Sequence, residues 1–333
     1  MGLLAGGCVS ADEQADQQAG EVHQTYGTTE NAVYQTYGVH NPPGVSPCAN
    51  RDCRYPRTAG QPADPLYPEF WTSRWTMYRI FNNYENNPPP YNGRPPASLV
   101  AGRDYEISQG ATYYDSTWRG ASGEGAMMEH YERRCLPIFP IRNDFTCSFI
   151  SLGNTAYFVT YDQDRPAGMP RVCLFSGWNH PPRRDFVSHL PFSADDSARL
   201  GDRAQAYSFW VNVSDGRPIQ TGASPDRTNV PAILFGYAFA PASASPGAPL
   251  QPSSFYFSGY PVAPANAPIV SQNYTDWAAV RPDPARTWDQ VSGLDPATLP
   301  RCHLFDPQTD GLLQGETAPR HPTWGHIGRW RGQ

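Results

Sequence analysis

The stretch AYSFWVNV, residues 206–213, decides the fold class of this 333-residue chain. Its large side chains Tyr207, Phe209 and Val211 alternate with the residues between them, which is the two-residue period of a β-strand. Asp215-Gly216 follows the stretch and is a typical hairpin turn. Similar strand-like runs recur along the chain at Tyr105–Tyr114, Ala156–Tyr161, Arg171–Phe175, Ile233–Phe239 and Phe255–Tyr260.

The connections between these runs are rich in proline and glycine. The chain contains 36 prolines and 29 glycines, which is typical of strands joined by many ordered loops. Pro241–Pro252, built mostly of Ala, Ser, Pro and Gly, is expected to form an exposed loop or flexible insertion. We therefore predict an α+β, β-rich fold, with a predominantly antiparallel sheet or sandwich, a few helices and long Pro/Gly-rich ordered loops.

Two segments show the three- and four-residue spacing of an amphipathic helix. In residues 65–87 the aromatic side chains recur at this spacing, and Pro88-Pro89-Pro90 would end the helix. Residues 123–134 combine apolar side chains on one side with an i,i+4 ion pair between Glu129 and Arg133. We expect a helix over each of these two segments.

The chain is divided into four parts. Residues 1–8 are interpreted as a residual leader with a lipobox-like end, residues 9–64 as an extended tether or arm, and residues 306–333 as a polar tail. Residues 65–305 show no internal boundary and are predicted to form a single globular α+β domain. Its C-terminal part is expected to carry only short helical pieces, at Thr287–Val291 and from Asp295-Pro296 onward.

The amino-terminal residues indicate where in the cell the protein resides. The chain begins MGLLAGGC, ending at Cys8, and then turns polar. Small residues before a cysteine, behind an apolar pair, resemble the lipobox of bacterial lipoproteins, in which the cysteine thiol receives a diacylglycerol. The usual leucine three positions earlier is missing and the apolar run is short for a signal peptide, so we expect the true start to lie upstream. The alternative is an ordinary terminus that happens to contain a cysteine.

Cysteine number favours an oxidising compartment. Removing Cys8 from the seven cysteines leaves six, an even number that suits three disulfides. We predict that neighbours pair, as Cys48–Cys53, Cys135–Cys147 and the long-range Cys173–Cys302, although fifteen connectivities exist. The competing interpretation is a zinc site, which the absence of C-x-x-C and of nearby histidines at ligand spacing disfavours.

Charge and composition exclude several function classes. All 25 basic residues are arginine, so a lysine Schiff base and a P-loop lysine are both ruled out. The net charge of −6 gives no general attraction to nucleic acid, and we expect no such partner. No run of eighteen apolar residues occurs, so the membrane contact would be the lipid on Cys8. No metal and no cofactor are expected.

The densest polar cluster lies in residues 179–189. Two histidines, two arginines and an aspartate in this loop can bind an anion or serve in acid–base chemistry. The alternative is a rigid loop whose arginines pair with carboxylates and whose histidines bond to the backbone. The candidate residues of this cluster are His180, Arg183, Arg184, Asp185 and His189.

Two weaker clusters were considered. The glycine-rich turn Gly120–Gly125 before a predicted helix can present N–H groups to an anion, but Glu124 in the turn would repel one. Glu129, His130 and Glu132 do not share one helical face, so a joint metal site is disfavoured. Asp162 and Asp164 alternate as calcium ligands do, without the rest of an EF-hand.

No named catalytic motif occurs, so enzymatic activity is not predicted. We expect an extracytoplasmic envelope lipoprotein, anchored to the bacterial outer membrane by Cys8, that serves as a structural or accessory subunit of a membrane-associated assembly and has an envelope protein partner. The alternative is a secreted hydrolase or carbohydrate-binding protein with Trp and Tyr stacking on sugar. A third is a secreted eukaryotic protein, from the formal glycosylation sequons at Asn212 and Asn273.

Overall fold

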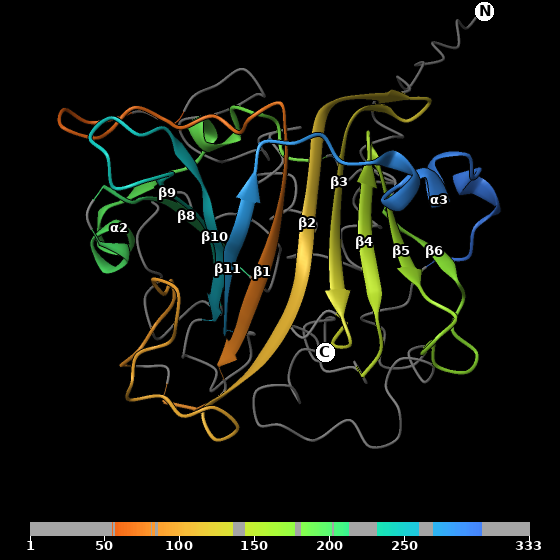
Figure 1. The fold of residues 1–333 in the computed structure, drawn as a ribbon, viewed down its shortest axis with the longest axis horizontal. Helices are drawn as coiled ribbons and strands as arrows, with labels where there is room; N and C mark the ends of the chain where they lie inside the picture. The colour runs from red at the N-terminus through yellow and green to blue at the C-terminus, as the bar shows by residue number, and fades with distance from the viewer. Residues whose placement is uncertain are drawn as a thin grey trace, which may run out of the picture.

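The computed structural model describes residues 55, 57–80, 82–83, 86–135, 144–176, 181–201, 203–212, 232–259 and 269–301. In these residues eleven strands form one antiparallel sheet, in the order β6-β5-β4-β3-β2-β1-β11-β10-β9-β8-β7 (Figure 1). The strands are β1 (Phe70–Ile80), β2 (Tyr105–Gly120), β3 (Gly123–Glu132), β4 (Cys147–Leu152), β5 (Thr155–Thr160), β6 (Val172–Ser176), β7 (Phe192–Ser193), β8 (Gln205–Asn212), β9 (Ala232–Pro241), β10 (Leu250–Gly259) and β11 (Ile269–Ala278). The predicted β-rich, antiparallel fold is confirmed, as a single sheet.

The helices are few and short. They are η1 (Phe186–His189), α2 (Ala194–Leu200), η2 (Pro284–Arg286), α3 (Asp289–Ser292) and η3 (Pro296–Thr298). The expected C-terminal helical pieces at 287–291 and from 295 onward correspond to α3 and η3. The sequence did not predict α2, which Ser193 caps by accepting a hydrogen bond from the backbone N–H of Asp196.

The predicted helix over residues 65–87 is wrong. This segment contains the central strand β1, which pairs with β2 on one side and with β11 on the other. Its aromatic residues follow a helical spacing, but the buried side chains Trp71, Trp75 and Met77 also fit the two-residue period of a strand. Backbone pairing on both edges and the strand preference of aromatic residues outweigh the helical pattern.

The predicted helix over residues 123–134 is also wrong, because residues 123–132 form β3. Met127 and Met128 are adjacent and both buried, since each face of the sheet is covered at this point. A strand that is buried on both faces loses its alternation, so the sequence pattern resembles the side of a helix.

The six strand-like runs were identified in the right places, and β4, β7 and β11 were missed. The predicted loop Pro241–Pro252 is corrected at both ends. β9 runs to Pro241 and β10 begins at Leu250, so the connection is a hairpin loop of residues 242–249. Pro252 is accommodated because the register of β10 against β9 shifts between Pro252 and Ser254, the kind of irregularity that tolerates proline within a sheet.

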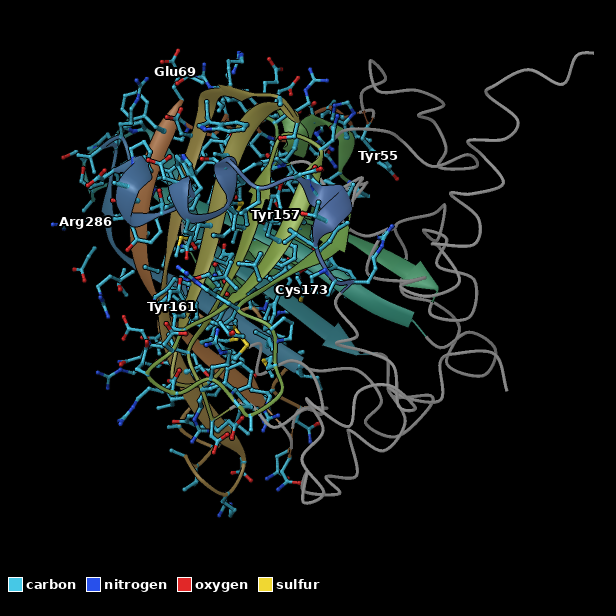
Figure 2. All side chains as sticks on the ribbon, turned by 90° about the vertical axis from the view of Figure 1, so that its right-hand side faces the viewer. Tyr55, Glu69, Tyr157, Tyr161, Cys173 and Arg286 are labelled. Atoms are coloured by element: carbon cyan, nitrogen blue, oxygen red, sulfur yellow. A yellow bond between two sulfur atoms is a disulfide. The ribbon has the colours of Figure 1, made fainter. Side chains whose placement is uncertain are left out.

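The two faces of the sheet carry different coverings. We call the face that carries Trp71, Trp75 and Met77 of β1 the inner face, and the opposite face the outer face. On the inner face, η1 packs through Phe186 and Val187 against one end of the sheet. On the outer face, α3 lies over the strands that carry Tyr157 (Figure 2). On the same face, α2 packs against β8–β10 through Leu200. Loop residues 86–100 cover the outer side of β1 and β11.

Candidate functional site

The predicted histidine–arginine cluster lies around η1. Arg183 pairs with Asp185 at 3.4 Å, and Arg184 donates from Nε to the carbonyl of Tyr67 at 2.8 Å. His189 is 1 % exposed within η1, and His180 lies outside the described residues. The structure therefore places the described members of this cluster in packing and backbone contacts.

Further contacts fix the same segment to the sheet. Arg57 donates to the carbonyls of Leu190 and Val187 at 2.7 and 2.8 Å, and Tyr114 donates to the carbonyl of Pro182 at 2.6 Å. These bonds orient η1 so that its apolar side chains enter the core. They support the interpretation of this loop as a rigid structural element.

The weaker clusters are also accounted for by local structure. Gly120 and Gly123 belong to the β2–β3 hairpin, where Glu124 pairs with Arg119 at 3.0 Å. Asp164 accepts from the N–H and the hydroxyl of Thr146 at 2.9 and 2.7 Å. Asp162 pairs with Arg165. No group of three or more His, Cys, Asp or Glu side chains suited to a metal occurs in the part of the chain that the structure describes.

Residues 129, 130 and 132 are separated by the two faces of a strand, because β3 alternates its side chains. His130 and Glu132 face outward. His130 Nδ1 lies 2.9 Å from Ser148 Oγ, and Glu132 accepts a 2.9 Å bond from Arg74. Glu129 faces inward, which the helix prediction could not indicate, and it is the centre of the candidate site.

Glu129 is held by side chains from neighbouring and distant strands. The Thr112 hydroxyl on β2 donates to Oε2 at 2.8 Å, and the Gln272 amide on β11 donates to the same oxygen at 3.2 Å. Because β2 and β1 lie between β3 and β11, this contact crosses two strands. The sheet is therefore curved here, with the inner face concave.

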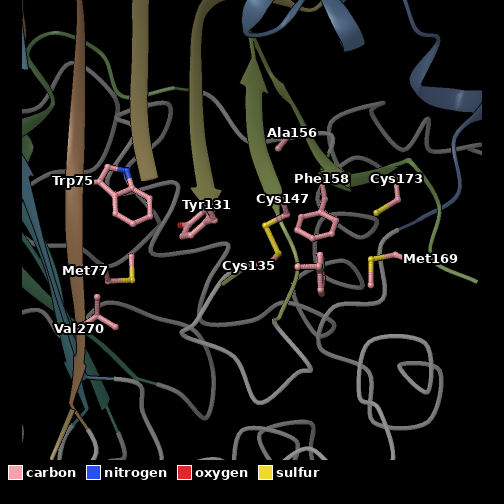
Figure 3. Packing of buried hydrophobic residues seen from close by; sticks show 11 residues of the cluster. Trp75, Met77, Tyr131, Cys135, Cys147, Ala156, Phe158, Met169, Cys173 and Val270 are labelled. Carbon is pink, nitrogen blue, oxygen red and sulfur yellow. A yellow bond between two sulfur atoms is a disulfide. The ribbon is translucent and has the colours of Figure 1, made fainter. Parts of the chain in front are cut away.

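Gly110 on β2 makes room for this arrangement. A Cβ at this position would lie 2.2 Å from the Trp75 ring and 2.0 Å from the His130 carbonyl oxygen. The Trp75 indole therefore lies over Gly110 and meets Tyr131 edge-to-face, with ring centroids 5.2 Å apart (Figure 3). A bulkier residue at 110 would displace the indole from beside the carboxyl group.

Burial raises the pKa of Glu129 to about 7, against the opposing effect of its hydrogen bonds with Thr112 and Gln272. The pKa of the nearby Tyr274 phenol is raised well above its ordinary value by burial and by the Glu129 charge. Arginines offset the other carboxylates of this sheet region, as in the Arg79–Glu106 pair. No arginine of the described residues pairs with Glu129, so its charge near neutral pH is compensated only by neutral donors.

Aromatic side chains border the carboxyl group on both sides. Phe149 is directly opposite Glu129 on β4, and Phe255 is opposite Gln272 on β10. These two rings and Tyr274 are partly exposed, as Glu129 is. The inner face thus combines half-buried aromatic rings with one acceptor group whose protonation changes near neutral pH.

This arrangement suits binding better than two-carboxylate hydrolysis. Glycoside hydrolysis uses two carboxyl groups roughly 5–9.5 Å apart. Glu106, the other inner-face carboxylate of strands β2 and β3, lies six residues from Thr112 along β2, about 20 Å away at the rise of a strand. The sequence signal for Glu129 was a lone carboxylate between Met128 and His130, which becomes visible only once 123–132 is assigned as a strand.

One predicted disulfide is confirmed. Cys135 and Cys147 are bonded, next to Tyr131 and Phe158 in the inner-face core (Figure 3). Cys173 is also disulfide-bonded, to a partner outside the described residues. Leu174, the residue after Cys173, forms an isolated parallel bridge with Arg301. The pairing Cys173–Cys302 stays a prediction, and Cys8, Cys48 and Cys53 lie outside the described residues.

Comparisons with known proteins give no family assignment. The sequence matches no protein-family model, and it matches no curated protein. Among the described helices none is long and apolar enough to cross a membrane.

Proposed function

We propose that this chain is an extracytoplasmic binding protein whose inner face takes an apolar or aromatic molecule carrying one hydrogen-bond donor. The observation that carries the proposal is Glu129, a carboxyl group without an arginine partner among the described residues, set in a partly exposed aromatic surface. A ligand N–H or O–H would add a donor to those of Thr112 and Gln272, and the apolar part of the ligand would pack on Phe149 and Phe255.

The test uses the fluorescent probe N-phenyl-1-naphthylamine, which combines aromatic rings with a single N–H donor. We expect saturable fluorescence enhancement with the full chain at pH 8. Glu129→Gln should weaken binding about tenfold, because a hydrogen bond to a charged acceptor contributes about 1.5–3 kcal/mol. Unchanged affinity in Glu129→Gln would exclude the inner face as the site.

Glu132→Gln is the matched control. It removes a carboxylate from the same strand but from the outer face, where Glu132 pairs with Arg74 on the surface. The probe should bind this variant as it binds the wild type. Equal weakening in both variants would indicate a general charge effect rather than a contact with Glu129.

We further propose that the protein is a lipoprotein anchored through Cys8 in an oxidising compartment. The Cys135–Cys147 disulfide supports the compartment, since cytosolic thiols are kept reduced. The intact mass of the protein from its native membrane fraction tests this. Loss of residues 1–7 with a lipid mass on Cys8 is expected, and an unmodified Met1 start would contradict it.

The hypothesis that the protein is an accessory subunit of a membrane-associated assembly stays a prediction. Purification from the native membrane as a monomer, without any co-purifying protein, would contradict it.

A further inference from the structure

The outer face carries a pocket that the inner-face site does not use. It has a volume of about 390 Å³ and lies between loop residues 91–94, α2 and the outer side of β1, β11, β10 and β9. Its lining includes Tyr78, Tyr91 and Arg94. A volume of this size is in the range of small-molecule sites in proteins.

Asn273 supplies buried donors in this pocket. Its side chain is 5 % exposed, and its Nδ2 has no hydrogen-bond partner among the described residues. The amide orientation is fixed by a short chain of bonds. The Tyr91 N–H donates to Ser271 Oγ at 3.2 Å, and that hydroxyl donates to Asn273 Oδ1 at 3.0 Å. The two N–H bonds of Nδ2 are therefore left for another acceptor.

The charge of the pocket is positive. Arg94 is the one formally charged residue among the described residues that line it, and no carboxylate of the described chain pairs with it. A guanidinium group binds a carboxylate through two parallel hydrogen bonds. Hydroxyl groups of Thr76, Ser253, Ser254 and Thr275 also line the pocket and can bond to ligand hydroxyls.

We propose that this outer-face pocket binds a small hydroxylated organic carboxylate of the uronic-acid type. Arg94 binds the carboxylate, the Asn273 amide donates to a ring or hydroxyl oxygen, and Tyr78 and Tyr91 border the sugar ring. The buried amide nitrogen has no acceptor among the described residues and the exposed Arg94 is paired with no described carboxylate, so both groups suit an acceptor-rich ligand. This site is on the opposite face of the sheet from Glu129 and does not depend on the function proposed there.

Isothermal titration of the full chain with D-glucuronate tests the proposal, with D-glucose as the neutral analogue. We expect D-glucuronate to bind, and D-glucose to bind at least tenfold more weakly because it lacks the carboxylate. Arg94→Gln should weaken D-glucuronate binding about tenfold. Asn273→Asp, which keeps the acceptor for Ser271 but replaces the donors by a carboxylate, should weaken it at least as much.

Arg286→Gln is the control, because Arg286 is an exposed arginine on η2 that does not line the pocket. It should leave D-glucuronate affinity unchanged. If Asn273→Asp fails to fold, the exposed Arg94→Gln decides alone. No D-glucuronate binding by the wild type, equal binding of both sugars, or full affinity in Arg94→Gln would each overturn the proposal. Glu129→Gln should not alter D-glucuronate binding, which separates failure here from failure of the inner-face site.

Discussion

Gln272 and Asn273 are neighbours in β11, yet they serve opposite faces and opposite chemistry. Gln272 donates to a carboxylate on the inner face, whereas the Asn273 amide nitrogen, on the outer face, has no acceptor among the residues that the structure describes. On neighbouring strands of the sheet, Arg74 instead pairs with Glu132. Adjacent residues of one strand can therefore contribute to two sites, because successive side chains point to opposite faces of the sheet.

The same packing arrangement occurs on both faces of the sheet: an aromatic ring lies directly over a glycine. Gly110 lies under Trp75 on the inner face, and Gly236 lies under Tyr256 on the outer face, where a Cβ would be 2.0 Å from the ring. Tyr256 in turn donates to the buried Asp196 at 2.5 Å. Each glycine therefore positions an aromatic side chain that borders polar groups.

The largest effect is expected from Gly110→Ala. The new methyl group would meet both the Trp75 ring and a backbone carbonyl oxygen, which cannot both move aside. We expect a loss of about 3 kcal/mol in the free energy of unfolding, as for severe overpacking. Urea denaturation followed by tryptophan fluorescence measures this.

Two further alanine variants sharpen this result. Gly236→Ala should be milder, about 1–2 kcal/mol, because its closest contact is a side-chain ring rather than the backbone. Gly293→Ala is the control, since nothing lies within 4 Å of its Cβ position. Equal stability of Gly110→Ala and Gly293→Ala would refute the packing of Trp75 against β2.

The sequence predicted most of the strands, but it did not predict which side chains meet on each face of the sheet. Alternation in residues 206–213 was sufficient for β8, because that pattern has one simple period. In β1 and β3 the spacing of Trp71, Trp75 and Met128 fitted two periods, and only the pairing with distant strands decides between them. The sequence could not show that Gln272 reaches Glu129, since this depends on sheet curvature and on a residue 143 positions away.

The residues that stand out in the sequence differ from those that carry the two proposed sites. Residues 183–189 are conspicuous because histidine and arginine are concentrated there, but η1 uses them in packing and backbone contacts. The sequence brought Glu129 to attention only as part of a helical cluster, and Asn273 only as a formal glycosylation sequon. In the described structure Glu129 has no charged partner and the buried Asn273 amide nitrogen has no acceptor, and both are properties of three-dimensional packing.

The next effect is the pH dependence of stability that Glu129 causes. Its pKa is about 7 in the folded protein against an ordinary value of 4.5, so the folded state holds the proton more tightly. The contribution of Glu129 to the free energy of unfolding is therefore complete below pH 4.5. It decreases as the pH rises towards 7 and is lost above pH 7. Glu129→Gln should therefore be more stable than wild type at pH 8, by on the order of 2 kcal/mol, and equal at pH 4.

Thermal or urea unfolding at both pH values measures that difference. Glu132→Gln again serves as the control, and it should change little between pH 4 and pH 8 relative to wild type because its ion pair is exposed. A constant difference between Glu129→Gln and wild type across this range would mean that Glu129 titrates normally.

The smallest effects are expected from two variants, each of which removes one hydroxyl group from one face of the sheet. Thr112→Val removes the donor to Glu129, and Ser271→Ala removes the group that bridges Tyr91 and Asn273. Each should lower the free energy of unfolding by about 1 kcal/mol, the typical contribution of one hydrogen bond. The consequences should then diverge. Thr112→Val should weaken naphthylamine binding at pH 8 by raising the Glu129 pKa, while Ser271→Ala should weaken D-glucuronate binding by freeing the Asn273 amide to rotate. Either variant affecting both ligands would mean that the two faces are coupled through β11 rather than independent.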